Sequence, residues 1–163
     1  MCAAGGLGDQ GAVSLGMPDS RLILPDEDAT RALAAAIAAK ARPGDVLLLS
    51  GPLGAGKTSF ARAFIRACAG VPDLEVPSPT FTLVQGYETP VGLVSHYDLW
   101  RLDGSLGLAE LGWDDALAGI VLVEWPDRLG GLTPPDALHI RLSLAGQGRE
   151  IELSGETRWF DAS

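Results

Sequence analysis

The residues of this chain that point most clearly to a chemical function lie between Gly51 and Thr58. They read Gly-Pro-Leu-Gly-Ala-Gly-Lys-Thr, a pattern in which two glycines five positions apart are followed directly by Lys and by Ser or Thr. A loop of this kind presents converging backbone N–H groups beside a helix N-terminus, and together they bind the dense negative charge of a polyphosphate. The glycines allow the backbone angles of the loop and the close approach of phosphate oxygens. The octet therefore predicts a binding loop for a nucleoside triphosphate.

Individual positions of this phosphate-binding loop have distinct expected roles. Lys57, one of only two lysines in the chain, is placed to reach the β- and γ-phosphates, and the Thr58 hydroxyl is placed to coordinate Mg²⁺. Backbone amides supply the other contacts. The residues expected to bind the nucleotide from the loop and the start of the next helix are Gly51, Leu53, Gly54, Ala55, Gly56, Lys57, Thr58 and Ser59.

Two acidic residues at the ends of apolar segments are candidates for the chemistry of hydrolysis. Glu124 directly follows the apolar run 120–123, and Asp98 ends a second strand-like segment. Hydrolysis needs an acidic group near Mg²⁺ and a group that positions water, and acids at the carboxyl ends of sheet strands are suited to both tasks. We expect Glu124 to bind the metal, and Asp98 to be an outer-shell ligand or to orient the attacking water. A plain solvated acid after a strand is the alternative for each, and His96 is more typical of packing than of chemistry.

The segment 77–82 reads Pro-Ser-Pro-Thr-Phe-Thr and has the composition of a nucleotide-sensing switch. Its two prolines favour an extended loop, and its hydroxyl groups, including those of Thr80 and Thr82, are suited to contact a γ-phosphate. Loops that are ordered by the γ-phosphate and Mg²⁺ and released after hydrolysis are common in phosphate-loop proteins. A structural turn that leads into a strand is the alternative.

The elements predicted around these residues form an α/β fold. Residues 45–50 are typical of a buried parallel strand that feeds the loop, 59–69 predict the helix behind it, and 120–123 predict a second buried parallel strand. The other expected elements are a strand at Arg21–Leu24, a helix from about Glu27 to Ala41, a brief helical segment at 107–117, and two antiparallel hairpins, 80–87 with 91–97 and 138–144 with 149–153. We therefore expect a three-layer fold of the P-loop NTPase type, with a mixed, mainly parallel central sheet and antiparallel hairpins.

Length and charge limit the kinds of protein that this sequence encodes. Its 163 residues fit one domain, expected at 21–158, with a disordered Gly- and Ala-rich extension at 1–20 and a short tail at 159–163. Lys and Arg total 12 against 21 Asp and Glu, which gives a formal net charge of −9. The average surface therefore repels nucleic-acid phosphate, and autonomous RNA binding is disfavoured.

Cysteine content and hydropathy indicate the compartment. Cys2 and Cys68 are the only cysteines and cannot make a disulfide framework. No apolar stretch approaches about 18 residues, and the start of the chain lacks the pattern of a secretory signal. We expect a cytoplasmic protein without membrane association.

Four sequence blocks, taken together, resemble a known family. They are 51–58 (Gly-Pro-Leu-Gly-Ala-Gly-Lys-Thr), 78–84 (Ser-Pro-Thr-Phe-Thr-Leu-Val), 96–102 (His-Tyr-Asp-Leu-Trp-Arg-Leu) and 123–126 (Val-Glu-Trp-Pro). In this order they closely resemble the TsaE (YjeE) family, the bacterial ATPase of tRNA threonylcarbamoyladenosine biosynthesis, over about residues 20 to 155. Pro52 departs from the usual acidic residue and Trp100 from the usual Tyr. Because Pro52 alters a loop side chain more than the phosphate-facing backbone, we expect the nucleotide site to be retained.

The resemblance implies an accessory ATPase that binds ATP or ADP with Mg²⁺ and does not itself modify tRNA. Members of the family associate with TsaD and TsaB, the subunits that transfer threonylcarbamoyl to adenosine 37, so contact with tRNA is expected to be indirect. By motif position, Lys57, Asp98 and Glu124 would be catalytic, and Thr58 would join Glu124 in binding Mg²⁺. The switch-like segment would couple the nucleotide state to the partner, and hydrolysis would reset the complex between turnovers.

The resemblance is less specific about the base end of the nucleotide. The family places the start of the first helix against the base, where Asp28 and Thr30 are the candidates in this chain. Arg128 is a further candidate for contact with the base or a phosphate, and a surface charge is its alternative.

Two other functions share a phosphate-binding loop. A small-molecule or nucleotide kinase needs an acceptor site and an arginine-bearing lid that excludes water, whereas here the stretch after Gly70 turns quickly into a hairpin. A GTPase switch selects guanine through an Asn-Lys-x-Asp element, and this chain contains no asparagine. Adenine is therefore the expected base.

Overall fold

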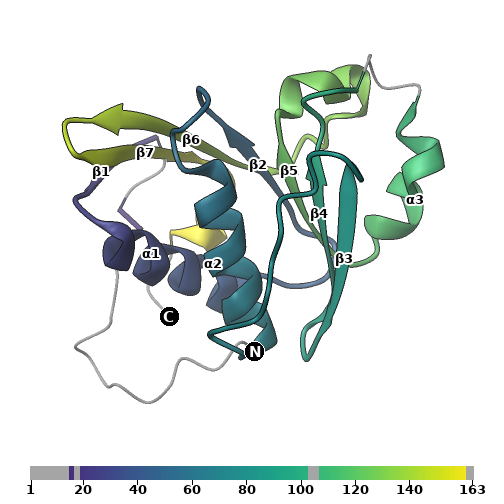
Figure 1. Ribbon diagram of the computed structural model, residues 1–163, viewed down its shortest axis with the longest axis horizontal. Helices are drawn as coiled ribbons and strands as arrows, with labels where there is room; N and C mark the ends of the chain where they lie inside the picture. Colours follow the sequence, from purple (N-terminus) through teal and green to yellow (C-terminus); the bar gives the residue numbers. More distant parts are fainter. Residues whose placement is uncertain (1–14, 17–18, 103–106, 161–163) are drawn as a thin grey trace.

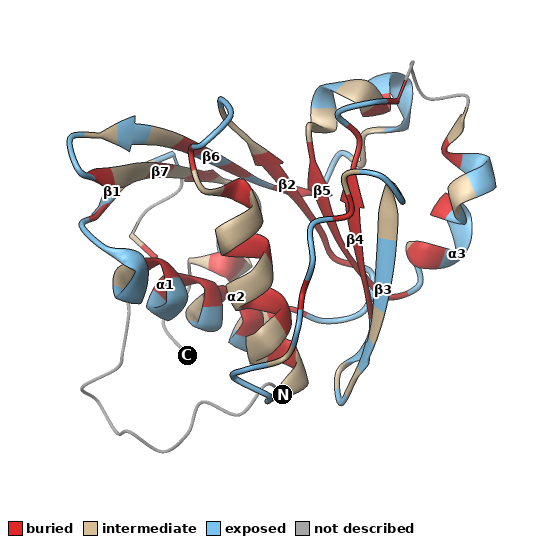
Figure 2. Cartoon of the chain, in the orientation of Figure 1, coloured by how far each residue is buried: buried red, intermediate tan, exposed pale blue. Residues whose placement is uncertain are grey.

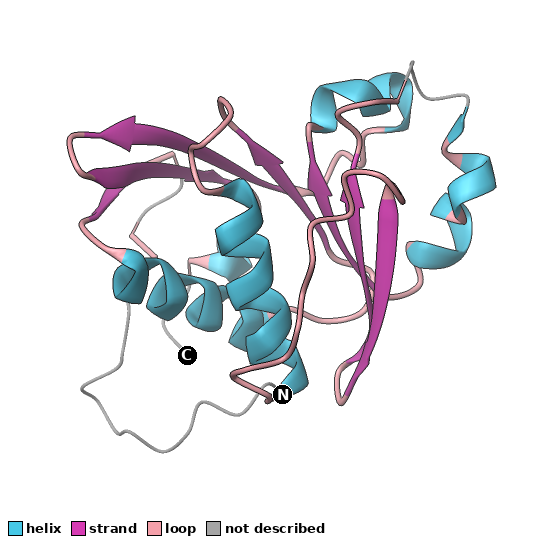
Figure 3. Ribbon diagram, in the orientation of Figure 1, coloured by secondary structure: helices cyan, strands magenta, loops and turns pink. Residues whose placement is uncertain are grey.

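A mixed sheet forms the centre of the computed structural model, which describes residues 15–16, 19–102 and 107–160. Its strands are β1 (Arg21–Leu24), β2 (Val46–Ser50), β3 (Val84–Thr89), β4 (Gly92–Asp98), β5 (Ile120–Glu124), β6 (Leu138–Ala145) and β7 (Gly148–Ser154). The helices are α1 (Glu27–Lys40), α2 (Lys57–Ala69), α3 (Trp113–Ala116) and the 3₁₀ helices η3 (Ala109–Leu111), η4 (Pro126–Leu132) and η5 (Thr157–Trp159) (Figure 3). None of these described helices is long and apolar enough to cross a membrane.

The order of the strands brings together segments that lie far apart in the sequence. Across the described sheet the order is β1-β7-β6-β2-β5-β4-β3. Strand β2 pairs in parallel with β5 and β6, and β5 pairs in parallel with β4. Strands β1, β7 and β3 join by antiparallel pairing. The expected mixed sheet is therefore confirmed, but parallel pairing is limited to the four central strands because antiparallel strands complete both edges.

Helices cover both faces of the sheet (Figure 1). Helices α1 and α2 pack on one face, where Leu33 and Phe64 are fully buried. Helix α3 and its neighbouring 3₁₀ helices cover part of the other face, where Trp113 contacts Tyr97 edge-on with ring centroids 5.3 Å apart. Strands β2 and β5 lie between these layers and are buried over most of their length (Figure 2). Burial on both faces explains their nearly continuous apolar sequences, and the predicted three-layer arrangement is confirmed.

Local sequence signals set the ends of the two helices beside the loop. Asp26 caps α1, since its carboxylate accepts a 2.9 Å hydrogen bond from the backbone N–H of Ala29. Helix α2 ends at Gly70, which has a left-handed φ of 71° and closes the last turn with its N–H. The predicted α1 is confirmed to within one residue, and α2 begins two residues earlier than predicted.

Two predicted elements differ from the structure. The strand predicted at 80–87 begins only with β3, because Leu83 has a φ of 68° and its N–H donates to the carbonyl oxygen of Pro79 in a turn. The helical segment predicted at 107–117 is divided into η3 and α3 by Gly112, which has a φ of 72°. In both cases one residue with positive φ ends a periodic pattern that continues in the sequence.

Residues near both ends of the chain contribute to the core. The following parts of the predicted extension and tail lie outside the described residues: 1–14, 17–18 and 161–163. Leu15 is buried, and the N–H of Asp19 donates a 2.8 Å hydrogen bond to Leu153. Trp159, which the sequence analysis assigns to the tail, is buried in the same core because its large indole ring packs with the residues beneath α1 and α2. The folded unit therefore extends beyond 21–158 at both ends.

Two phenylalanines test this packing. Phe64 is fully buried, whereas Phe81 is 84% exposed. Phe64→Ala removes buried apolar surface and leaves a cavity, so we expect the free energy of unfolding to fall by about 3–5 kcal/mol, against about 0.5 kcal/mol or less for Phe81→Ala. Urea unfolding followed by circular dichroism measures both values. Equal losses for the two variants would contradict the packing of α2.

Candidate functional site

The phosphate-binding loop lies at the carboxyl end of β2 and leads directly into α2. Gly51, Gly54 and Gly56 have φ values of 138°, 81° and 102°, which glycine adopts far more readily than other residues. Gly51 also packs closely on the neighbouring strand, since a Cβ on it would lie 2.2 Å from the carbonyl oxygen of Leu142 on β6. Gly56 gives α2 no side-chain cap, so the N–H groups of the first turn are available to an anion.

Lys57 folds back over the loop that precedes it. Its Nζ donates hydrogen bonds to the carbonyl oxygens of Gly51 at 2.6 Å and Pro52 at 3.0 Å. Burial lowers the pKa of Lys57 from its ordinary value, and the negative charges of Glu124 and Asp98 partly oppose this shift. The ammonium group is therefore held at the loop by neutral carbonyl groups, which the oxygens of a phosphate can replace.

The carboxylates of Asp98 and Glu124 lie at the ends of neighbouring parallel strands. The two residues are register partners in the pairing of β4 with β5, and both are almost fully buried. The Thr58 hydroxyl lies 3.0 and 3.1 Å from the two carboxylate oxygens of Glu124. The Nε2 atom of the fully buried His96 lies 2.7 Å from Oε2 of the same carboxylate. Glu124 is therefore held by α2 on one side and by β4 on the other.

Asp98 connects this acidic centre to the segment that precedes β3. Its Oδ2 accepts a 3.3 Å hydrogen bond from the Thr80 hydroxyl, and its Oδ1 accepts a 3.1 Å bond from the backbone N–H of Trp100. The hydroxyl groups of Thr80 and Ser78 lie 2.8 Å apart. The segment with the composition of a switch therefore contacts the acidic centre through the hydroxyl of Thr80.

The side chains at this centre fit a Mg²⁺ ion. Thr58 and Glu124 present oxygen atoms to each other beside the loop, and Asp98 adds a second carboxylate on the adjacent strand. Mg²⁺ takes oxygen ligands, and proteins usually hold it with only one or two side chains while phosphate and water complete the coordination. The arrangement can therefore hold the metal next to a polyphosphate bound in the loop.

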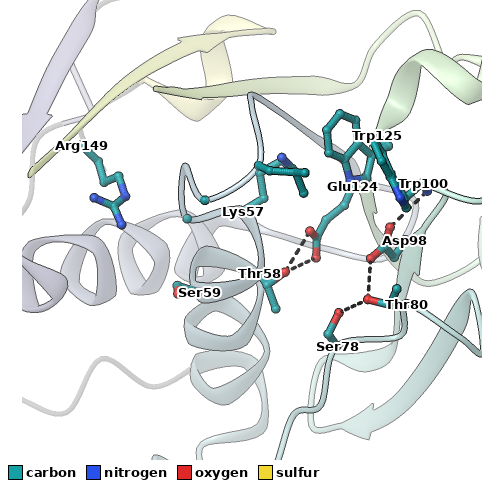
Figure 4. A pocket seen from close by; sticks show the side chains of 13 residues that line it. Lys57, Thr58, Ser59, Ser78, Thr80, Asp98, Trp100, Glu124, Trp125 and Arg149 are labelled. Carbon is teal, nitrogen blue, oxygen red and sulfur yellow. Dashed lines mark hydrogen bonds between the residues drawn. The ribbon is translucent and has the colours of Figure 1, made fainter. Parts of the chain in front are cut away.

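A cleft of about 380 Å³ unites these groups (Figure 4). Its volume lies within the range of small-molecule sites. In the view of Figure 4, Glu124 and Asp98 lie on one side of the loop and Arg149 lies on the other. A second cavity of about 130 Å³ adjoins the cleft, and Gly56, Ser59 and Arg149 line both.

Most of the residues predicted to bind a nucleotide lie at this cleft. Those that line it are Leu53, Gly54, Gly56, Lys57, Thr58, Ser59, Thr80, Asp98 and Glu124. Gly51 contributes its carbonyl oxygen to Lys57, Ala55 is fully buried, and Thr30 lines the second cavity. The roles of these residues stay predictions, but the fold brings them together.

Like Gly51 and Ala55, three predicted binding residues outside the loop line neither cavity. Asp28 is exposed on the first turn of α1 and pairs with Arg31. Thr82 is exposed in the turn before β3, whereas Thr80 lines the cleft. Arg128 lies in η4, with its Nε buried among other groups. Whether a side chain at one of these positions lines a cavity depends on the local rotation of the backbone, which the motifs do not specify.

The structure adds residues that the motifs did not identify. Trp125 and Trp100 lie together at the cleft with ring centroids 4.4 Å apart and ring planes tilted by 49°, and Lys57 Nζ lies 4.0 Å from the centroid of Trp125. Arg149 reaches the cleft from β7, near the other end of the sequence. Trp125 carried a sequence signal, its position directly after the predicted metal ligand, whereas Arg149 carried none.

Known proteins resemble the chain over the region that forms this site. A family model described as "Threonylcarbamoyl adenosine biosynthesis protein TsaE" matches residues 24–151. A Rickettsia felis protein named "tRNA threonylcarbamoyladenosine biosynthesis protein TsaE" is 37% identical over 131 residues, which cover 80% of this chain and 76% of that protein. A Bacillus subtilis protein of the same name is 39% identical over 134 residues, which cover 80% of this chain and 81% of that protein. The crystal structure of Bacillus subtilis YdiB, at 32% identity, superposes with a TM-score of 0.71 and covers 90% of this chain and 92% of its own.

The pKa of Lys57 tests the electrostatics of the cleft. Glu124 makes the larger of the two charge contributions that oppose the lowering of this pKa by burial. Glu124→Gln removes that charge, so we expect the pKa of Lys57 to fall further. An NMR pH titration of protein with ¹³C-labelled lysine measures it, and Lys40→Arg assigns the two lysine signals. An unchanged or higher pKa in Glu124→Gln would contradict the proximity of the two groups.

Proposed function

The chain belongs to the TsaE family, and we propose that it is an ATPase that supports the formation of threonylcarbamoyladenosine in tRNA. The observation that carries this proposal is the contact between Thr58 and the buried carboxylate of Glu124 directly beside the phosphate-binding loop. In nucleoside triphosphatases of this type, a hydroxyl of the loop and a strand-end carboxylate hold the Mg²⁺ that accompanies the β- and γ-phosphates.

Binding of ATP replaces contacts within the protein by stronger ones. The loop N–H groups bind phosphate oxygens, and Lys57 exchanges two neutral carbonyl oxygens for anionic ones, which strengthens its hydrogen bonds. Thr58 and Glu124 would hold the Mg²⁺ ion, and the hydrogen bond between His96 and Oε2 would keep the carboxylate in place. When bound, Mg²⁺ neutralises negative charge that develops on the phosphate oxygens.

Asp98 is the residue proposed to position the attacking water. It lines the cleft, and the N–H of Trp100 fixes one of its oxygens. The other oxygen is available to accept a hydrogen bond from water once the Thr80 hydroxyl leaves it for the γ-phosphate. The segment before β3 would then differ between the ATP and ADP states, because the same hydroxyl bonds to a phosphate in one and to Asp98 in the other.

We propose that the partners of this chain are TsaD and TsaB, which would distinguish its ATP state from its ADP state. We also propose that it acts in the cytoplasm. The relatives are named for tRNA threonylcarbamoyladenosine biosynthesis. A formal net charge of −9 disfavours direct binding of tRNA by this chain, so contact with tRNA would fall to the partner subunits.

The connection after α2 favours hydrolysis over transfer to a second substrate. Between α2 and β3 the described chain runs through turns and extended backbone and contains no helix that could close over the cleft. A kinase needs such a closure, because water in the site would compete with the acceptor for the phosphate.

The two lysines of the chain test the nucleotide site. Lys57→Ala removes the ammonium group from the loop, and we expect the affinity for Mg²⁺-ATP to fall about tenfold or more and hydrolysis to be lost. Lys40→Ala removes the same charge at the end of α1 and should change the affinity less than about twofold. Calorimetry and phosphate release measure the two effects. Equal affinities of the two variants would refute nucleotide binding at this loop.

Substitution of Glu124 tests metal binding separately from phosphate binding. Glu124→Ala leaves the loop and Lys57 in place, so we expect the variant to retain nucleotide binding in the absence of Mg²⁺. Hydrolysis that depends on Mg²⁺ should be lost, because the variant lacks one of the two metal ligands. If Glu124→Ala hydrolysed ATP at the wild-type rate, the metal assignment would be wrong.

A further inference from the structure

His96 lies one step before the two carboxylates of the cleft along the paired strands β4 and β5. Its register partner is Leu122, and Asp98 and Glu124 form the next pair on the same face of the sheet. Leu122 belongs to the core that α1 and α2 cover. His96 therefore lies between an apolar core and the acidic centre, with Glu124 as its diagonal neighbour on the adjacent strand.

One ring nitrogen of His96 has a partner and the other has none. Nε2 lies 2.7 Å from Oε2 of Glu124, whereas Nδ1 is buried without a hydrogen-bond partner among the described residues. The side chain of His96 is 0% exposed, so bulk water does not reach Nδ1. This asymmetry determines which nitrogen of the imidazole carries the proton.

The contact with Glu124 assigns the imidazole proton to Nε2. An ionised carboxylate only accepts hydrogen bonds, so the nitrogen that faces it has to donate. A proton on Nδ1 alone would instead leave a lone pair of Nε2 facing the carboxylate oxygen. Protons on both nitrogens would leave a charged N–H group without an acceptor in the core, which costs more free energy than a bare ring nitrogen. The neutral imidazole protonated at Nε2 is therefore the form that fits both surroundings.

The charge of the imidazole determines how strongly Glu124 attracts a cation. A neutral ring donates one hydrogen bond to Oε2 and leaves the negative charge of the carboxylate in place, whereas an imidazolium would neutralise that charge and repel a cation. The other oxygen, Oε1, lies 3.0 Å from the Thr58 hydroxyl. We propose that His96, as a neutral imidazole protonated at Nε2, is a positioning residue that fixes Oε2 and leaves Oε1 and the charge of Glu124 to Mg²⁺. This inference rests on the proposed function, because it requires a metal at Glu124.

A carboxylate that is already held binds a metal more tightly than a mobile one. A free side chain loses rotamer freedom when it coordinates a metal, and a hydrogen bond that fixes one oxygen beforehand removes part of that cost. Residues that orient metal ligands typically contribute about 10–100-fold in metal affinity. In the proposed site the phosphates contact Lys57 and the N–H groups of the loop and not His96. Loss of His96 should therefore weaken metal binding more than metal-free nucleotide binding.

The first test determines the position of the proton in the full-length wild-type protein. ¹⁵N NMR of labelled imidazoles distinguishes a nitrogen that carries a proton from one that does not, and His139→Gln assigns the signals of the two histidines in the chain. At neutral pH and without any ligand, we expect His96 to have a protonated Nε2 and an unprotonated Nδ1. A protonated Nδ1, alone or together with Nε2, would overturn the inference.

The second test compares His96→Leu with His96→Gln, because Gln offers an N–H donor in place of Nε2 and Leu offers none. The probe is an ATP analogue with an imido group between the β- and γ-phosphates, titrated by calorimetry with and without Mg²⁺. His96→Leu should reduce the gain in affinity from Mg²⁺ by about tenfold or more, and change the metal-free affinity less than about twofold. His96→Gln should recover part of the loss.

His139→Leu is the matched control, because His139 is exposed on β6. It should change both affinities less than about twofold. A loss of affinity in His96→Leu that is equal with and without Mg²⁺ would indicate general damage to the fold and would overturn the inference. Wild-type protein that gains no affinity from Mg²⁺ would refute the metal site of the proposed function. A gain in the wild type that His96→Leu retains in full would refute the role of His96 alone.

Discussion

In the parallel pairing of β2, β5 and β4, the carboxyl ends of three strands meet at one edge of the sheet, and each strand brings a different part of the site. Strand β2 leads into the phosphate-binding loop, β5 ends at Glu124 and β4 ends at Asp98. Register matters as much as order, because a shift of one residue in β4 would move Asp98 to the opposite face of the sheet. The buried apolar residues of these strands fix that register, so the core of the protein determines the geometry of the site.

The same arrangement places two carboxylates in a poorly solvated position, which is costly unless they are paired. The structure offsets this cost with hydrogen bonds from Thr58 and His96 to Glu124, with the N–H of Trp100 bonded to Asp98, and with the charge of Lys57 nearby. Each carboxylate of the centre therefore has a partner within the protein, whereas the buried Nδ1 atom of His96 has no hydrogen-bond partner among the described residues. In the proposed function, a bound nucleotide and Mg²⁺ would exchange these partners for phosphate and metal contacts.

The sequence predicted the parts of the site that depend on local order along the chain. The octet at 51–58, with a strand before it and a helix after it, identified the loop. The positions of Asp98 and Glu124 at the ends of apolar runs identified them as the acidic residues of the site. Sequence reasoning assigned His96 only a packing role, because nothing local indicates that β4 places the imidazole beside Glu124. Arg149 lies beside the loop because β7 pairs with β6 and β6 pairs with β2, a consequence of sheet order that no motif contains.

The predicted binding residues that line neither cavity differ from the others for a different reason. The residues of α1 that line the second cavity are Glu27 and Thr30 but not Asp28, because successive helical residues point in different directions and the motif gives no starting angle. Thr82 is displaced from the cleft by the turn at Leu83, whose positive φ is unusual for a leucine and has no signature in the sequence.

The distribution of charge in the cleft also explains why we expect nucleotide binding to depend on Mg²⁺. Its lining holds two cations, Lys57 and Arg149, and two carboxylates, Asp98 and Glu124, so the charges balance before any ligand enters. A metal-free triphosphate would bring several negative charges beside buried carboxylates, where the low local dielectric strengthens repulsion. In the proposed function, Mg²⁺ held by Glu124 would remove this repulsion at the end of the cleft where the terminal phosphates would lie. Lys57 lies near the carboxylates and Arg149 lies on the other side of the loop, so the proposed metal would be needed at the end of the cleft that holds the carboxylates.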